Sequence, residues 1–158
     1  MKGLFLTDEP VSMKKYIFIM ALIGLVPSLL ISILITASGL FGQVGPDINP
    51  NMPVGAIVFS FSILSPILET LMMSLFFLIL SLFIKSKPKL AVASAVLWAL
   101  LHSLVSPPWG LIIVWPFYVF SCAYLTWRSK SWLKAIWVTA CIHFLQNLLP
   151  SIAIMFAM

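Results

Sequence analysis

The sequence has very few charged residues for its length. Only 8% of its 158 residues are Asp, Glu, Lys or Arg, whereas a soluble domain has about 25%. Hydrophobic residues make up 62% of the chain, and its mean hydropathy is +1.15. This composition excludes a soluble fold and predicts an all-α polytopic membrane bundle, with room for about five helical spans. We expect a single transmembrane domain over residues 1–158.

Acidic side chains are especially scarce. The chain has four, and Glu69 is the only one after Asp47. Glu69 lies inside an apolar run long enough to cross a bilayer. An isolated carboxylate in hydrocarbon is costly, so Glu69 must be neutral, paired or turned toward a polar cavity. A residue of this kind is by default a candidate for a functional site.

Cysteine is also rare, and the basic residues do not form a long basic segment. Cys122 and Cys141 fall inside apolar runs, so we interpret them as small apolar core residues and not as a disulfide or a metal pair. The nine Lys and Arg residues occur in three short clusters between apolar runs. The net charge of +5 therefore does not indicate a nucleic-acid partner.

Five apolar runs predict five transmembrane helices. They cover about residues 16–40, 54–84, 90–105, 109–127 and 135–158. We expect a kink near Pro66, an interruption at Pro116 and, as an option, a break at Pro150.

The distribution of basic residues predicts the orientation of these spans. All nine fall on one side of a five-span arrangement, so the positive-inside rule predicts a cytoplasmic N-terminus. The small size and uniform membrane character favour a multi-pass protein of a prokaryotic plasma membrane.

Further polar side chains fall at a depth similar to that of Glu69. At about 1.5 Å per residue, Glu69, His102 and His143 lie roughly 22, 18 and 13 Å from the basic ends of their spans. Asn147 follows His143 by four residues and shares its helix face, as Trp98 does with His102. We therefore expect Glu69, His102, His143 and Asn147 to meet in one cavity between the second, third and fifth spans.

Together these residues resemble the three motifs of the CAAX protease and bacteriocin-processing family (CPBP, or Abi) of intramembrane proteases. The family motifs are Glu-Glu-x-x-x-Arg after a small-Pro pair, Phe-x-x-x-His and His-x-x-x-Asn. The corresponding stretches here are Ser65-Pro66-Ile67-Leu68-Glu69, Trp98-Ala99-Leu100-Leu101-His102 and His143-Phe144-Leu145-Gln146-Asn147. The resemblance covers about residues 62–149, which it identifies as a CPBP-like catalytic core.

The first motif departs from the family pattern at two positions. Thr70 stands where the family has its second Glu, and Ser74 stands where it has Arg. These positions are an i,i+4 pair, on which Glu and Arg can form an ion pair. Removing one partner would strand a charge at a cost of about 3–5 kcal/mol, whereas removing both strands none. We interpret the change as the loss of both partners of a structural ion pair. Whether activity is retained stays open.

The resemblance implies hydrolysis of a peptide bond within or near the bilayer. Glu69, helped by His102, would activate a water molecule, while His143 and Asn147 would position that water or stabilise the oxyanion. The alternative is a metal-dependent reaction in which Glu69, His102 and His143 bind zinc or another divalent metal. We rank it slightly lower because the sequence lacks the His-Glu-x-x-His spacing of common zinc proteases.

Two other functions stay open from the sequence. One is a catalytically inactive CPBP-like membrane protein with an immunity or partner-binding role. The other, which is weaker because no inverted repeat is evident, is a small proton-coupled transporter. The expected partners are membrane lipid and a peptide or protein substrate. The resemblance implies a prenylated C-terminal motif or a bacterial leader peptide as that substrate, and the sequence does not choose between them. The oligomeric state is left open.

Overall fold

The computed structural model describes residues 4–8, 10–42, 44–46, 48–49 and 51–157, with side chains as far as residue 153. Asp47, Glu9 and the ends of the predicted 1–158 domain lie outside these residues. The described part is helical and contains no strand, so the predicted all-α membrane bundle is confirmed. Its helices are α1 (Met13–Ser38), α2 (Val54–Phe59), α3 (Ser65–Leu80), α4 (Lys87–Ser103), α5 (Pro107–Arg128) and α6 (Trp132–Ala157).

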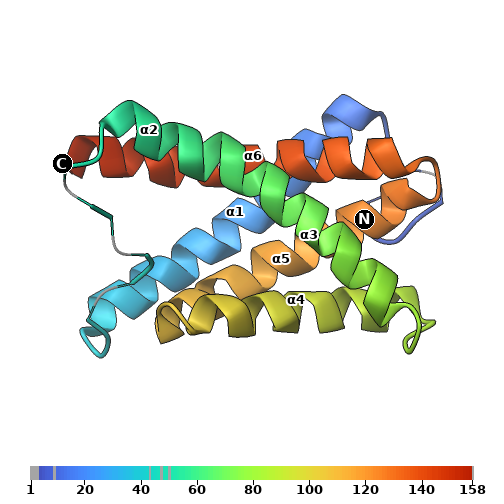
Figure 1. Ribbon diagram of the computed structural model, residues 1–158, viewed down its shortest axis with the longest axis horizontal. Coiled ribbons are helices and arrows are strands. Elements are labelled where there is room, and N and C mark those ends of the chain that lie inside the picture. The colour runs from blue at the N-terminus through green and yellow to red at the C-terminus, as the bar shows by residue number, and fades with distance from the viewer. Residues whose placement is uncertain (1–3, 9, 43, 47, 50, 158) are drawn as a thin grey trace.

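Four helical segments of the described chain are long and apolar enough to cross a membrane. These are Met13–Ser38, Val54–Leu80, Pro107–Arg128 and Trp132–Ala153. The remaining helix, α4, has only 17 residues. It nevertheless returns the chain along the bundle from the end of α3 to the start of α5 (Figure 1). The chain therefore runs the length of the bundle five times, and the third pass is the short one.

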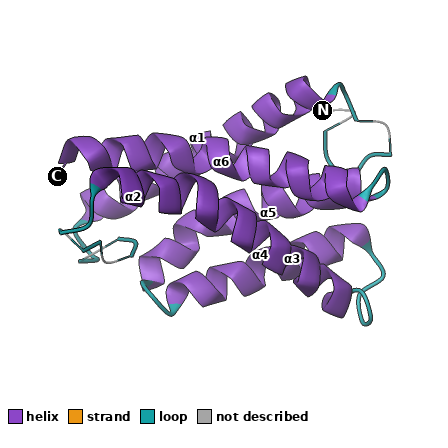
Figure 2. Ribbon diagram, turned by 45° about the horizontal axis from the view of Figure 1, so that its top comes forward, coloured by secondary structure: helices purple, strands orange, loops and turns teal. Residues whose placement is uncertain are grey.

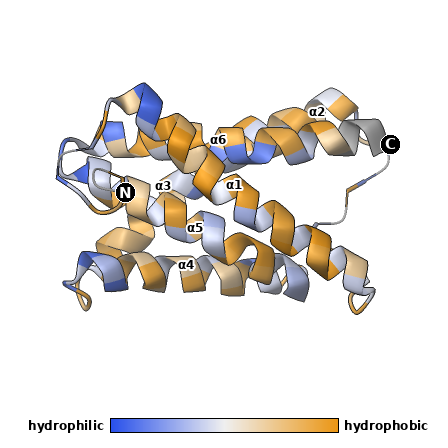
Figure 3. Ribbon diagram, turned by 180° about the vertical axis from the view of Figure 1, so that it is seen from behind, coloured by the Kyte–Doolittle hydropathy of each residue, from blue (hydrophilic) through white to orange (hydrophobic). Residues whose placement is uncertain are grey.

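The exterior of the bundle is apolar, and its charge lies at one end. Large side chains such as Leu34, Leu78 and Leu133 are 67–70% exposed, as a surface that contacts lipid requires. Loops at the two ends of the bundle join the helices (Figure 2). The strongly hydrophilic positions near the N-terminus, the α3–α4 loop and the α5–α6 loop gather at the same end (Figure 3).

Prolines in the described helices lie in the first turn or inside the helix, and none of them ends a helix. Pro107 and Pro108 are the first residues of α5, where a missing N–H costs nothing. The expected interruptions at Pro116 and Pro150 are wrong, because α5 and α6 continue through them. A broken helix in lipid would expose several backbone groups, so losing one hydrogen bond is the smaller cost.

Pro66 has a larger local effect on the backbone. A π-helical segment, Ser60–Leu64, joins α2 to α3 directly before it. At the end of that segment the N–H of Ser65 bonds to the carbonyl of Ser60, five residues back. Where a kink was predicted near Pro66, the structure has a change of helical register inside one continuous run, Val54–Leu80.

The α4–α5 pair packs closely because Gly110 has no side chain. A Cβ at Gly110 would overlap the carbonyl oxygen of Ala99 and the side chain of Ser103. Further along the same pair, Ser121 donates a hydrogen bond to Ser94. Small residues of this kind let helices approach one another in lipid, where no hydrophobic driving force holds them together.

Replacing Gly110 with Ala should therefore destabilise the protein by about 1–3 kcal/mol, because the α4 backbone must move away. Gly55→Ala is the matched control, since a Cβ there meets nothing within 4 Å, and it should be neutral or stabilise by about 0.5–1 kcal/mol. Thermal unfolding of both purified variants in detergent measures the difference. Equal unfolding temperatures would contradict this account of the packing.

Candidate active site

A cavity of about 540 Å³ lies between the helices, and Glu69, His102, His143 and Asn147 all line it. The sequence predicted that these four residues would share one cavity between the second, third and fifth spans. The structure brings them together and adds two walls, one from α1 and one from α5. Their chemical roles stay predictions, which the local geometry described below makes specific.

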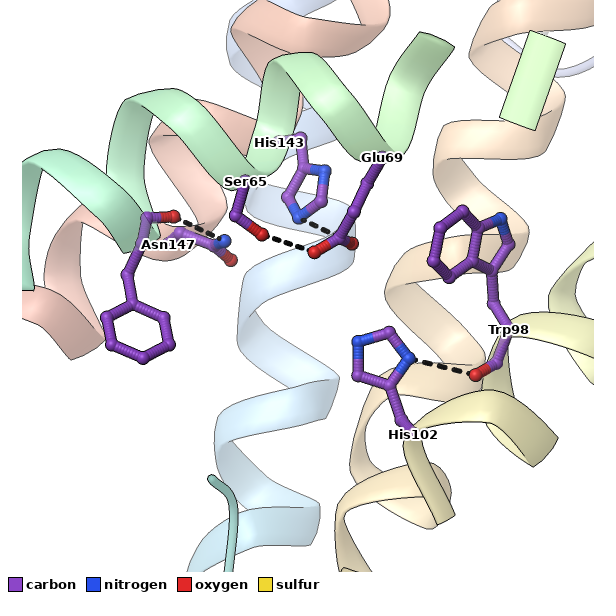
Figure 4. Close-up of polar contacts among 7 residues, drawn as sticks. Ser65, Glu69, Trp98, His102, His143 and Asn147 are labelled. Carbon is purple, nitrogen blue, oxygen red and sulfur yellow. Dashed lines mark hydrogen bonds and ion pairs between the residues drawn. The ribbon is translucent and has the colours of Figure 1, made fainter. Parts of the chain in front are cut away.

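The Glu69 carboxylate has polar neighbours on two helices. Ser65, one turn earlier on α3, donates a hydrogen bond to Oε1. Oε2 lies 3.9 Å from Nε2 of His143 on α6, an ion-pair distance if the imidazole is protonated. Figure 4 shows the carboxylate directed at both groups. The side chain is 20% exposed, so Glu69 faces the cavity and is not enclosed by packed side chains.

His143 is the most enclosed of the four residues. Its side chain is 4% exposed, and its ring stacks on Phe120 with centroids 4.4 Å apart. Phe117 contacts the same ring edge-on at 5.6 Å. Two aromatic rings of α5 therefore fix the plane of the imidazole and aim Nε2 at Glu69.

The contact that His102 makes with its own helix determines its tautomer. Its Nδ1 lies 2.9 Å from the carbonyl oxygen of Trp98. A carbonyl can only accept, so Nδ1 carries the proton, and in the neutral ring Nε2 is left with a free lone pair. The ring packs edge-on against Trp109 at 4.5 Å, and it lies tilted against Phe117 at 5.2 Å. His102 thus brings a proton acceptor to the cavity that also contains Glu69.

Asn147 satisfies a backbone group that Pro66 leaves without a partner. Its Nδ2 donates to the carbonyl of Phe61 at 2.9 Å. In an α-helical pattern that carbonyl would accept from Ser65, but the Ser65 N–H bonds to Ser60. In a π-helical pattern it would accept from Pro66, which has no N–H. Asn147 therefore ties α6 to the irregular turn that precedes Glu69.

The two positions that depart from the family pattern lie away from the cavity lining. Thr70 is fully buried, and its hydroxyl has no partner among the described residues. Ser74 is hydrogen-bonded at 2.7 Å to the hydroxyl of Tyr124 and accepts from Trp132 Nε1 at 3.0 Å. Where the family has a charged i,i+4 pair, this chain thus has neutral hydrogen bonds that join Ser74 of α3 to α5 and α6.

The sequence reasoning missed a second polar pair in the cavity. Gln146 is 6% exposed, and its Nε2 donates to Ser28 of α1 at 2.8 Å. Gly24 makes room for it, because a Cβ there would lie 2.9 Å from Gln146 Oε1. Both Gln146 and Ser28 line the cavity. The sequence did contain one signal that Gln146 faces the cavity: its carboxamide comes three residues after His143, on the same face of an apolar helix.

A metal-binding role for Glu69, His102 and His143 would need all three donors around one ion. Among the described residues, no group of three or more His, Cys, Asp or Glu side chains is close enough to hold one. Glu69 Oε2 and His143 Nε2 approach each other to 3.9 Å, but His102 does not join them in a three-donor group of this kind. This arrangement does not fit a zinc site, and the reaction proposed below uses no metal.

Comparison with known families adds one finding. A family model described as "Rce1-like: Type II CAAX prenyl endopeptidase Rce1-like" matches residues 50–149. No curated protein and no solved structure matches the chain. The matched region contains α2 to α5 and the part of α6 that carries His143 and Asn147, while α1 lies outside it.

Asn147→Leu should lower the free energy of unfolding by about 1–3 kcal/mol, because the Phe61 carbonyl would be left without a donor. Leucine has nearly the same size, so a loss of packing alone would not explain the change. Thermal unfolding in detergent measures it. Asn51→Ala, at an exposed loop position, is the control and should lie within about 0.5 kcal/mol of the original protein. A neutral Asn147→Leu would contradict the assigned bond.

Proposed function

Because the chain belongs to the Type II CAAX prenyl endopeptidase Rce1-like family, we propose that it is an intramembrane endopeptidase of the CPBP type. The observation that carries this proposal is the cavity in which the Glu69 carboxylate, the His102 imidazole and the His143 imidazole occur together. The protein is a multi-pass membrane protein, and we assign it to a prokaryotic plasma membrane. Its substrate is a peptide or protein with a bond at this depth.

In the proposed reaction, Glu69 is the general base. Its carboxylate takes a proton from water while the hydroxide attacks the scissile carbonyl carbon, and His102 Nε2 accepts a hydrogen bond from the same water. His143 and the second N–H of Asn147 stabilise the oxyanion. Glu69 then delivers its proton to the leaving nitrogen as the C–N bond breaks. The products are a carboxylic acid and an amine, so the atoms and protons balance.

The arrangement at positions 70 and 74 supports activity over an inactive homologue. Thr70 and Ser74 are outside the cavity lining, so replacing Glu and Arg there removes no group from the site. Ser74 keeps a link between α3 and α5 through Tyr124. An inactive protein with an immunity or partner-binding role is the alternative, and the variants below distinguish the two.

Glu69→Gln should reduce cleavage by about 10²- to 10⁴-fold, because a carboxamide cannot accept the proton from water. The amide keeps the size of the side chain and an acceptor for Ser65, so folding should be preserved. Asp8→Asn is the matched control, since Asp8 pairs with Lys87 at the exposed surface. Cleavage is measured as the appearance of new protein termini in the membranes of cells that express each variant. If cells with the Glu69→Gln variant show the same termini as cells with the original chain, the inactive homologue is favoured.

His102→Phe should cause a loss of similar size, about 10²-fold or more, because it removes the Nε2 acceptor. Phenylalanine retains a ring to pack between Trp109 and Phe117, which are its present neighbours. The same measurement of termini is used, with protein abundance and thermal unfolding as checks on folding. Normal cleavage by a folded His102→Phe protein would remove His102 from the mechanism.

A further inference from the structure

The hydroxyl of Ser65 does not follow a bonding pattern that recurs in this chain. In four serines at or within the helices, the hydroxyl donates to the carbonyl three residues back; they are Ser28, Ser38, Ser81 and Ser129. A bond of that kind keeps the hydroxyl on its own backbone. The Ser65 hydroxyl instead points forward along α3 and donates to Oε1 of Glu69, four residues later (Figure 4).

The surrounding backbone favours this forward bond. A helical serine can also bond to the carbonyl four residues back, which for Ser65 is the carbonyl of Phe61. That carbonyl already accepts from Nδ2 of Asn147 at 2.9 Å. A carboxylate is also the stronger acceptor of the two, because it is charged. The hydroxyl is therefore directed to Glu69.

The bond from Ser65 makes the two carboxylate oxygens of Glu69 unequal. Oε1 accepts the Ser65 hydroxyl. Oε2 lies 3.9 Å from Nε2 of His143, which is beyond the range of a direct hydrogen bond. Ser65 and Glu69 both line the cavity. Of the two oxygens, Oε2 is therefore the one left with free lone pairs for a water molecule there.

We infer that Ser65 is a positioning residue of the proposed reaction: its hydroxyl holds Oε1 and thereby presents Oε2 as the oxygen that takes the proton from water. The inference rests on the proposed peptidase function, in which Glu69 is the general base. Ser65 acts through Glu69 and exchanges no proton with water or substrate.

The open side of the cavity makes such a restraint necessary. The Glu69 side chain is 20% exposed, and His143, its other polar neighbour, is too far away to hold it by a hydrogen bond. A glutamate has three rotatable side-chain bonds, so without Ser65 its carboxylate could turn within the cavity. A displacement of about 1 Å in a reacting group can cost about 10²-fold in rate.

The same bond serves both proton transfers of the proposed reaction. While Glu69 is ionised, Ser65 donates to a charged oxygen. Once Oε2 carries the proton, Oε1 is the carbonyl oxygen of the acid, and it still accepts from the same hydroxyl. The carboxyl group therefore keeps one orientation between taking the proton from water and delivering it to the leaving nitrogen.

Ser65→Ala should slow cleavage by about 10- to 10²-fold, because the carboxylate loses the bond that orients it. Ser65→Thr keeps a hydroxyl and should restore most of the rate. Ser65 is only half-buried beside the cavity, so one extra methyl group has room. Ser81→Ala is the matched control, since that hydroxyl bonds to its own backbone at the exposed end of α3. The rate at which new protein termini appear measures cleavage, and thermal unfolding checks the fold of each variant.

Infrared spectroscopy of the full chain in detergent tests the bond itself without any substrate. A hydrogen bond to the carbonyl oxygen of a protonated acid weakens its C=O bond and lowers the stretching frequency. Spectra are recorded at a pH low enough to protonate every carboxyl group. Subtracting the spectrum of Glu69→Gln isolates the band of Glu69.

The expected result is that Ser65→Ala moves this band to higher frequency and slows cleavage, that Ser65→Thr reverses both changes, and that Ser81→Ala shows neither. An unmoved band in Ser65→Ala would overturn the inference, because the bond would be absent. A moved band with unchanged cleavage, or slow cleavage by Ser65→Thr with its band restored, would overturn the positioning role. Normal cleavage by Glu69→Gln would instead refute the peptidase function, which the band does not measure, so the two failures are distinguishable.

Discussion

A carboxylate inside the hydrocarbon layer has to be solvated by the protein itself, and this requirement falls on Glu69. At the centre of a transmembrane helix, insertion measurements put the cost of an acidic residue at about 2.5–3.5 kcal/mol. The bundle meets that cost with a hydroxyl from Ser65, an imidazole from His143 and an open cavity. Two further features lie around this group: the aromatic ring stacked on His143, and the hydrogen bond from Asn147 to the α2–α3 run.

Pro66 connects backbone geometry with the site. By removing an N–H it leaves the carbonyl of Phe61 without a helical partner, and the π-helical turn shifts the register of everything that follows. Asn147 supplies the missing donor from another helix, so the carbonyl that would otherwise be a cost becomes the attachment point between α6 and the helix of Glu69. A residue expected to act on the substrate therefore also holds the site in position. The destabilised turn and the catalytic candidates depend on one another.

The sequence made the main groups of the site predictable but not their partners. Glu69, His102 and His143 stood out because polar groups are costly in apolar spans, and counting residues from the basic ends set them at similar depths. The bond from Asn147 to Phe61 could not be foreseen, since it depends on a π-helical register that leaves no periodic signal. The Gln146–Ser28 pair could not be foreseen either, because sequence alone does not say which face α1 turns inward. Pro116 and Pro150 were misread because the cost of opening a helix in lipid outweighs the loss of a single bond.

Helix α1 supplies a wall of the cavity without supplying any of its reactive groups. It meets α6 at the point where Gly24 allows the Gln146 carboxamide to lie against it, and it lies outside the region that matches the family. Changes at Leu25, Leu29 or Ser32 would reshape the cavity while leaving the carboxylate and both imidazoles untouched. This part of the cavity wall is thus encoded apart from the residues assigned to the proposed reaction. During divergence, a protein built this way could change the shape of its cavity by altering a single helix that carries none of the residues assigned to the proposed reaction.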